Sequence, residues 1–167
     1  GIEVFGIRHG YRGLIEGDIC KLSMDDVRNI AHKGGTILKT ARCKEFITEE
    51  GQRRALLTAQ AFDLEGVIAI GGDGTMHGAG ALSKMGVPTI TLPGTIDNDL
   101  AYTDFSIGFD TAVNGVLTEL IKVRDTMVSH DRVGIIEVMG NKCGDIALHA
   151  GVAGSADFIL LPEMEFN

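Results

Sequence analysis

Short apolar runs alternate with amphipathic segments along this chain, and the two clearest runs each end in a polar, glycine-containing stretch. These runs are residues 67–70 and 87–92, and both are rich in β-branched side chains. Runs of this length and composition are typical of buried parallel strands. The segments around them carry apolar residues at helical spacing, so we expect an α/β fold with a parallel sheet.

The same pattern predicts the other elements. Further strands are expected at 3–7, 19–22, 133–138 and 158–161. Helices are expected at 24–32, 48–64, 76–85, from Asp110 or Thr111 to 128, and at 145–153. The pair Ser23 and Asp26 has the spacing of a helix-capping motif. Glycines between residues 9 and 18 indicate an irregular loop there.

Composition narrows the class of protein. Of the 167 residues, 44% are hydrophobic and 23% charged, which is typical of a folded globular chain. The formal net charge of −8 argues against a nucleic-acid partner, because phosphate backbones are bound by clustered Lys and Arg. The three cysteines are far apart in sequence, which favours reduced thiols in a cytoplasmic protein. No apolar run is long enough to suggest a membrane span.

The first central run stops at the sequence GGDGT, residues 71–75. Glycines let the backbone approach a phosphate and present N–H groups to it, and a following helix adds its positive N-terminal end. Asp73 stands between glycines, in a position to hold Mg²⁺ directly or through water. The alternative is a tight turn with a capping aspartate.

The second central run ends in PGTIDND, residues 93–99. Asp97 and Asp99 are two residues apart, so in extended backbone their side chains point the same way. One carboxylate can accept a proton from a hydroxyl group while the other helps to hold a metal ion. Ligands of open parallel sheets bind outside the carboxyl ends of strands, so we expect Asp73 in the same crevice. A turn rich in Asn and Asp would explain Asn98 but not three converging carboxylates.

These motifs, in this order, resemble the phosphofructokinase family over essentially the whole chain. The resemblance also includes the stretches GIRHGYRGLIEGD, KGGTILKTAR, SHDR, VGIIEVMG and PEMEF. GGDGT alone is shared with NAD kinases and lipid kinases, whereas PGTIDND followed by VMG is specific. The family fold implies two Rossmann-like three-layer α/β/α lobes with mainly parallel sheets, incomplete at both ends. Residues 1–108 would form most of the nucleotide-binding lobe and residues 109–167 the first part of the sugar-phosphate-binding lobe.

The resemblance implies phosphoryl transfer from MgATP to the 1-hydroxyl of fructose 6-phosphate, a step of glycolysis. Asp97 would act as the base, Thr95 and Arg42 would act on the transferred phosphoryl group, and Asp73 and Asp99 would hold Mg²⁺. The residues implied to bind the nucleotide are Gly72, Asp73, Gly74, Thr75 and Arg42. Those implied to bind the sugar phosphate are Thr95, Asp97, Met139, Gly140, Asn141 and, from a neighbouring subunit of a homotetramer, Arg132. Arg124 and Asp157 match effector-site positions.

Two glycines bear on the phosphoryl donor. The family's pyrophosphate-using members typically carry Asp where this chain has Gly74 and Lys where it has Gly94. Small residues leave room for a nucleotide α-phosphate, so ATP is favoured. A pyrophosphate-dependent phosphotransferase of the same fold is the nearest alternative, and an NAD or lipid kinase is disfavoured by PGTIDND.

Two departures from the family pattern leave further questions open. Asn141 stands where bacterial ATP-dependent members usually carry Arg, which keeps a regulatory homologue that binds without turnover as another alternative. Met24 stands where well-studied members carry an effector-binding Arg. The family's first strand and its glycine-rich loop would precede Gly1, and later sugar-phosphate ligands would follow Asn167. We therefore expect these 167 residues alone to be inactive.

Overall fold

The computed structural model describes residues 1–165, which divide into two compact units. The first unit comprises Gly1–Ala69 and Met76–Ile90, and the second comprises Ile70–Thr75 and the residues from Thr91 onward. GGDGT and PGTIDND therefore fall in the same unit. The expected lobe boundary between residues 108 and 109 is a different division, and it stays a prediction.

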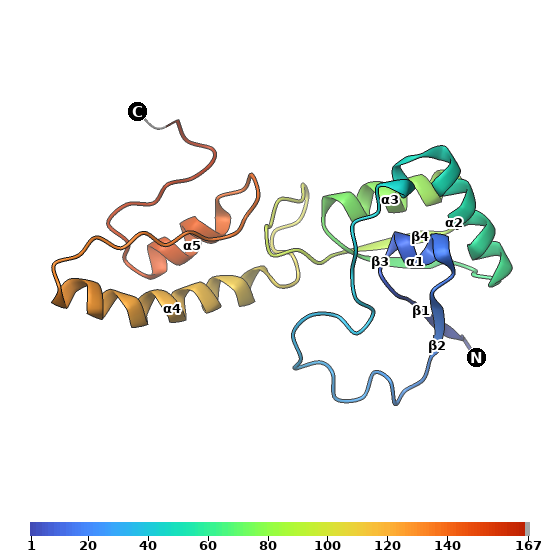
Figure 1. Cartoon of the computed structure of the whole chain (residues 1–167), viewed down its shortest axis with the longest axis horizontal. Coiled ribbons are helices and arrows are strands. Elements are labelled where there is room, and N and C mark those ends of the chain that lie inside the picture. The colour runs from blue at the N-terminus through green and yellow to red at the C-terminus, as the bar shows by residue number, and fades with distance from the viewer. Residues whose placement is uncertain (166–167) are drawn as a thin grey trace. The chain divides into compact units, whose positions relative to one another are not determined.

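The first unit begins with a β-hairpin whose connection contains a helix (Figure 1). Strands β1 (Val4–Ile7) and β2 (Ile19–Leu22) confirm the two strands expected there, and they pair antiparallel, an arrangement that the sequence did not predict. The loop expected between them is wrong in part, because helix α1 (Tyr11–Glu16) forms there. A Cβ atom on Gly13 would clash with the carbonyl oxygen of Arg8, so this glycine serves close packing rather than an irregular turn.

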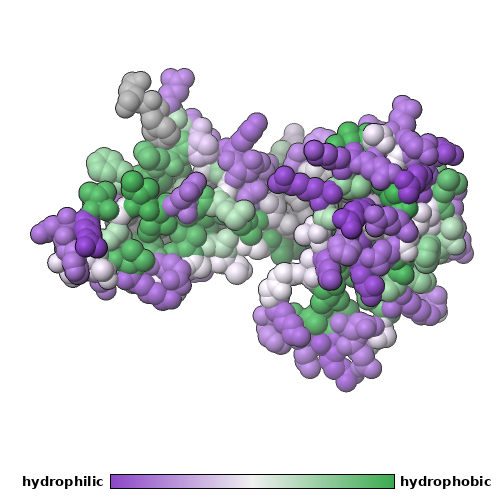
Figure 2. All heavy atoms as spheres, in the orientation of Figure 1, coloured by the Kyte–Doolittle hydropathy of each residue, from purple (hydrophilic) through white to green (hydrophobic). Residues whose placement is uncertain are grey.

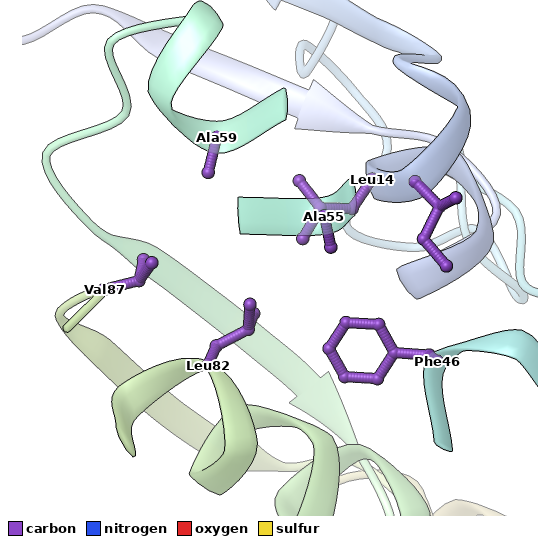
Figure 3. Packing of buried hydrophobic residues seen from close by; sticks show 7 residues of the cluster. Leu14, Phe46, Ala55, Ala59, Leu82 and Val87 are labelled. Carbon is purple, nitrogen blue, oxygen red and sulfur yellow. The ribbon is translucent and has the colours of Figure 1, made fainter. Parts of the chain in front are cut away.

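Helix α2 (Glu49–Ala61) follows the short 3₁₀ helix η1 (Glu45–Ile47) and confirms the helix predicted at 48–64. It begins after Thr48, whose hydroxyl oxygen accepts a hydrogen bond from the Gly51 N–H at 3.1 Å. The hydrophobic core of this unit lies between α1, η1, α2 and the far end of α3, and Figure 3 shows its side chains directed toward one another. Its buried members are Leu14, Ile15, Phe46, Ala55, Ala59, Leu82 and Val87.

The two central strands pair with each other and are joined by a helix in a β–α–β unit, which confirms the predicted α/β class. Strand β3 (Val67–Gly71) is followed by helix α3 (Asp73–Lys84) and strand β4 (Thr89–Pro93), and the two strands form one parallel sheet. The predicted strands are therefore confirmed. The helix begins at Asp73 instead of residue 76, which places most of GGDGT within its first turn.

The helix expected at 24–32 is wrong, because this segment forms only turns. The Ser23–Asp26 capping pair does form, with the Ser23 N–H and hydroxyl donating to the Asp26 carboxylate at 2.7 and 2.6 Å. Asn29, however, adopts a left-handed φ of 57°, and Met24 is 78% exposed. A short helix is stabilised mainly by burying an apolar face, and this segment buries none.

The second unit contains helices α4 (Phe109–Ser129) and α5 (Asp145–Ala153), which pack side by side (Figure 1). Both helices are confirmed. The expected cap at Asp110 or Thr111 is wrong, since α4 begins after Gly108, which has a φ of 101° and no capping side chain. Between Asp145 and Ala153 the helix buries Ile146 and Ala150.

The strands expected at 133–138 and 158–161 are wrong, since neither segment pairs with another strand among residues 1–165. Val133, Ile135 and Phe158 are 94%, 90% and 88% exposed. Figure 2 shows apolar residues on the surface of this part of the chain. A strand needs a neighbour to bond its N–H and C=O groups, so the apolar pattern alone does not produce one.

The β3–β4 sheet is covered on one face only within the described residues. Ala69 is buried, whereas its neighbours Ile68 and Ile70 are 65% and 64% exposed, as is Ile90 at 64%. This alternation is that of a sheet with one packed face and one open face. Nowhere in the described part of the chain is a helix both long and apolar enough to cross a membrane.

Candidate active site

The GGDGT and PGTIDND motifs lie against each other where β3 and β4 end. The Gly94 N–H donates to the Gly71 carbonyl at 2.9 Å, which continues the pairing of the two strands beyond Pro93. A Cβ atom on Gly72 would lie 3.3 Å from Thr95, so the backbone of one motif contacts a side chain of the other. The carboxyl ends of both strands therefore open into one polar region.

GGDGT forms the junction between β3 and α3. Asp73, Gly74 and Thr75 lie in the first turn of the helix, where backbone N–H groups and the helix dipole favour an anion. The Thr75 N–H donates to the Gly72 carbonyl at 2.9 Å, which closes the turn. No atom lies within 4 Å of a Cβ built on Gly74, so this position borders open space. The geometry suits a phosphate group at the helix end.

Gly74 and Gly94, the two glycines expected to indicate the phosphoryl donor, differ in their surroundings. A Cβ on Gly94 would lie 2.9 Å from the Ile70 side chain and 3.5 Å from the Gly71 nitrogen. Packing of the strand ends is therefore a second reason for glycine at position 94, independent of the phosphoryl donor. Gly74 has no such neighbour, so of the two it is the better indicator of the donor.

The PGTIDND loop is held by its own polar groups. The Asp97 N–H donates to the Thr95 hydroxyl at 3.2 Å, and the buried Ser106 hydroxyl donates to the Thr95 carbonyl. Asn98 has a left-handed φ of 55°, so the chain turns between the two aspartates. The strictly extended backbone assumed for residues 97–99 is therefore wrong.

Asp97 has the electrostatic environment of a candidate base. Partial burial raises the pKa of its carboxyl group, and repulsion from the Asp99 carboxylate raises it further. Each effect disfavours the charged form, which makes the carboxylate a better proton acceptor. Asp99 itself is exposed to solvent.

A second turn, residues 139–144, joins this loop through Asn98. The Asn98 side-chain amide donates to the Asp145 carboxylate at 2.8 Å, and the Cys143 thiol donates to the Asn98 carbonyl at 3.9 Å. In the turn itself the Cys143 N–H donates to the Gly140 carbonyl at 2.8 Å. Gly140 has a φ of 150°, and a Cβ there would clash with the Cys143 carbonyl oxygen. Glycine is therefore required at this position.

The remaining sugar-site candidates also lie in the second unit. Met139 is 73% exposed, and Asn141 is exposed with a left-handed φ of 57°. Arg132 follows α4, and its N–H donates to the Met127 carbonyl at 2.9 Å. Its guanidinium group makes no hydrogen bond or ion pair with residues 1–165. These side chains are thus available to a ligand or a neighbouring molecule.

Three further candidates are not brought to this region by any described contact. Arg42 lies in the first unit, exposed in the loop before η1. The Arg124 guanidinium donates to the Gly154 carbonyl at 3.1 Å, and Asp157 is exposed near the end of α5. The roles implied for these residues stay predictions.

Asp73 and Asp99 are suited to hold Mg²⁺ only together with ligands that are not part of the protein. No three Asp, Glu, His or Cys side chains gather as a ligand set within the described residues. Mg²⁺ is usually held by one or two carboxylates together with phosphate oxygens and water, so an all-protein cage is not needed. Asp73 and Asp99, on adjoining motifs, fit such a site.

Asn98, Ser106 and Asp145 were missed as site residues in the sequence. Asn98 was assigned only to an Asx-type turn, and its side-chain bonds to residues far along the chain carry no local sequence signal. Ser106 is 4% exposed and bonds both Thr95 and Asn98. The one local clue in the sequence was the asparagine itself between two aspartates, because Asn adopts a left-handed φ more readily than most residues.

A family model described as phosphofructokinase matches residues 1–167. This chain belongs to the phosphofructokinase family. It is 56% identical over 167 residues to a protein of Clostridium botulinum named ATP-dependent 6-phosphofructokinase, and the match covers 100% of the chain and 52% of that relative. The chain therefore spans about half the length of the curated relatives it matches.

Solved phosphofructokinase structures share the fold. The structure of phosphofructokinase from Saccharomyces cerevisiae matches 96% of this chain and 25% of its own, with a TM-score of 0.87 and 32% identity. The pyrophosphate-dependent phosphofructokinase of Marinobacter aquaeolei matches 99% of this chain and 45% of its own, with a TM-score of 0.82 and 27% identity. The fold of this chain is thus also found in a pyrophosphate-dependent phosphofructokinase, so the fold by itself does not identify the phosphoryl donor.

Proposed function

We propose that the protein containing this chain transfers the γ-phosphoryl group of MgATP to the 1-hydroxyl of fructose 6-phosphate, a reaction of glycolysis. The observation that carries the proposal is the contact between the two motifs, with Gly72 against Thr95 and Asp97 in the adjoining loop. A phosphate-binding helix end and a candidate base then share one region. The name of the 56% identical relative supports ATP as donor.

Asp97 is proposed as the general base. Its carboxylate accepts the proton of the sugar 1-hydroxyl, whose oxygen forms a bond to the γ-phosphorus as the bond from that phosphorus to the β–γ bridging oxygen breaks. ADP is the leaving group. The raised pKa of Asp97 favours proton transfer. The Thr95 hydroxyl accepts a hydrogen bond from the Asp97 N–H, and Thr95 lies against Gly72, so it holds the loop beside GGDGT. Positioned bases of this kind typically contribute about 10²–10⁴-fold.

Asp73 and Asp99 are proposed to hold Mg²⁺, which would neutralise charge on the β- and γ-phosphates. Gly72, Gly74 and Thr75 would contact the nucleotide phosphates at the start of α3, and Arg42 would stabilise the transferred group. Met139, Gly140 and Asn141 would contact the sugar. Each assignment follows the family motif at these positions.

The assembly and location of the protein are also proposals. Arg132 would bind the 6-phosphate of a sugar held by a neighbouring subunit of a homotetramer. Its exposed guanidinium, which has no partner within residues 1–165, is consistent with that role. A glycolytic enzyme of this kind acts in the cytoplasm. Arg124 and Asp157 would contribute to an effector site.

The test is turnover by the full-length protein carrying this sequence. Fructose 6-phosphate phosphorylation is measured with MgATP and, separately, with magnesium pyrophosphate. We expect turnover with ATP and none with pyrophosphate. Turnover with pyrophosphate alone would refute the donor assignment and retain Asp97 as the base. Ligand binding without turnover would support the regulatory alternative.

A further inference from the structure

Asn98 lies between the two aspartates of PGTIDND and reaches out of the loop to the turn before α5. Building on the proposed function, we propose that Asn98 is a positioning residue that ties the loop of the base Asp97 to the sugar-contact turn, residues 139–144. The tie is the hydrogen bond from its side-chain amide to the Asp145 carboxylate. The base Asp97 and the bound sugar are thereby held in a fixed position relative to each other.

The side chain of Asn98 uses all of its hydrogen-bonding directions. Its Nδ2 group donates to the Asp145 carboxylate at 2.8 Å and to the Asp104 carbonyl at 3.2 Å, while Oδ1 accepts from the Ser106 N–H at 3.0 Å. An amide has two N–H donors and one carbonyl acceptor, so this set requires both kinds of atom. Aspartate would lose both donors, and glycine would lose every side-chain bond.

The backbone at Asn98 adds a second requirement. Its φ of 55° lies in the left-handed region, which most residues with a side chain avoid. Asn and Gly tolerate this conformation, but of the two Asn alone can make the side-chain bonds. The preceding Asp97 and following Asp99 are both assigned to the reaction, so a shift at position 98 moves both carboxylates.

Asp145, the partner of the Asn98 amide, belongs to helix α5 and not to a loop. It is the first residue of α5, and the Gly144 N–H just before it is bonded to the Glu163 carboxylate at 2.7 Å. The Cys143 thiol also donates to the Asn98 carbonyl at 3.9 Å. The Asn98 loop therefore contacts the turn through both its side chain and its backbone. A hydrogen bond to a carboxylate is stronger than one between neutral groups, so the Asp145 bond is the main tie.

The experiment exchanges the two partners in the full-length protein. Asn98→Asp places a carboxylate against Asp145 and breaks the tie. We expect kcat/KM for fructose 6-phosphate to fall about 10-fold to 100-fold, the range for losing a hydrogen bond to a charged group, with KM for ATP changed less than about twofold. The double variant Asn98→Asp/Asp145→Asn restores a hydrogen bond of reversed polarity, since the carboxylate at 98 accepts from the amide at 145. It is expected to recover at least about tenfold of the loss.

Matched variants separate positioning from folding. Asn114→Asp makes the same substitution on exposed α4, where the amide donates only to the Asp110 carbonyl, and is expected to leave kinetics unchanged. Asn98→Gly keeps the left-handed backbone without the tie. It is expected to lose kcat/KM for the sugar at a temperature where its melting curve shows that the protein is still folded, with KM for ATP little changed. If Asn98 only stabilised the loop, activity and melting temperature would instead fall together.

Each outcome decides the question. A double variant no better than Asn98→Asp, or an Asn98→Gly protein with normal kcat/KM for the sugar, would overturn the positioning role. Equal losses toward sugar and ATP that follow the melting temperature would do the same. A wild-type protein without turnover would overturn the proposed function itself, and with it the role assigned to Asn98, whereas active wild type with a failed exchange overturns the Asn98 proposal alone.

Discussion

Replacing Gly74 by aspartate tests the donor assignment with little disturbance of the fold. Gly74 lies in the first turn of α3, has no positive φ, and has no atom within 4 Å of the position that a Cβ would take. An added side chain therefore meets neither a clash nor backbone strain. An acidic residue in the first turn of a helix also interacts favourably with the helix dipole, by about 0.3–1 kcal/mol. We expect the melting temperature of Gly74→Asp to be unchanged or slightly raised.

The effect on ATP is expected to be large and electrostatic. The new carboxylate would stand where the α-phosphate of a nucleotide has to fit. Two unit charges about 5 Å apart at an effective dielectric constant of about 20 repel each other by roughly 3 kcal/mol. That energy corresponds to a loss on the order of 10²-fold in kcat/KM for ATP. Pyrophosphate has no α-phosphate and does not meet this repulsion.

The assay compares kcat/KM for MgATP and for magnesium pyrophosphate in wild type and variant, at saturating fructose 6-phosphate. Gly80→Asp is the matched control, because Gly80 lies on the same helix with no atom within 4 Å of its Cβ position. It adds the same charge away from GGDGT, and its kinetics should equal those of wild type.

Unchanged kcat/KM for ATP in a folded Gly74→Asp protein would refute the reasoning, because no nucleotide phosphate could then lie beside position 74. An equal loss in Gly80→Asp would attribute the effect to net charge alone. Loss of activity together with a lowered melting temperature would contradict the claim that position 74 borders open space.

Four further variants test the base, its neighbour, the sugar-contact turn and a helix cap. Asp97→Ser should lower kcat about 10³-fold with little change in nucleotide affinity, and near-normal turnover would remove Asp97 from the role of base. The same variant should have a larger free energy of unfolding at pH 7, measured by denaturant titration. The raised pKa of Asp97 means that the fold favours the neutral carboxyl group. This group therefore stabilises the fold most at low pH, and the contribution is lost as pH rises through its pKa. Asp99→Asn removes one cause of the raised pKa, so the acidic limb of the kcat/KM profile for the sugar should move to lower pH; a shift to higher pH would contradict the repulsion. Asn141→Arg adds a positive charge within the proposed sugar-contact turn and should raise kcat several-fold, measured at saturating substrates; an unchanged kcat would mean that Asn141 does not lower the rate. Thr48→Ala removes the cap of α2 and should cost about 1 kcal/mol of unfolding free energy without altering kcat.

Local patterns predicted the elements whose stability is mostly local or given by their immediate neighbours. The strand at β3, the capped helix α2 and the long helix α4 all follow from apolar spacing and turn residues. The two motifs at the strand ends were also predictable, because sheet topology brings the carboxyl ends of adjacent parallel strands together.

The failures came where long-range contacts decide. The segment 133–138 has the composition of a strand, but no described strand pairs with it. The segment 24–32 has a capping pair but no buried face. Gly13 was interpreted as a loop residue because sequence does not reveal that it packs on the Arg8 carbonyl. Asn98 was underestimated for the same reason, since its partner Asp145 lies far along the chain.

The open face of the β3–β4 sheet affects the protein while it is being synthesised and folded. Ile68, Ile70 and Ile90 expose apolar side chains on paired strands, and exposed apolar surface of this kind can associate with other polypeptides during synthesis and refolding. While this face is open, the chain is exposed to association with other polypeptides. Substitutions that leave the candidate site intact can therefore still reduce the amount of folded protein in the cell, if they prolong the time for which this face is exposed.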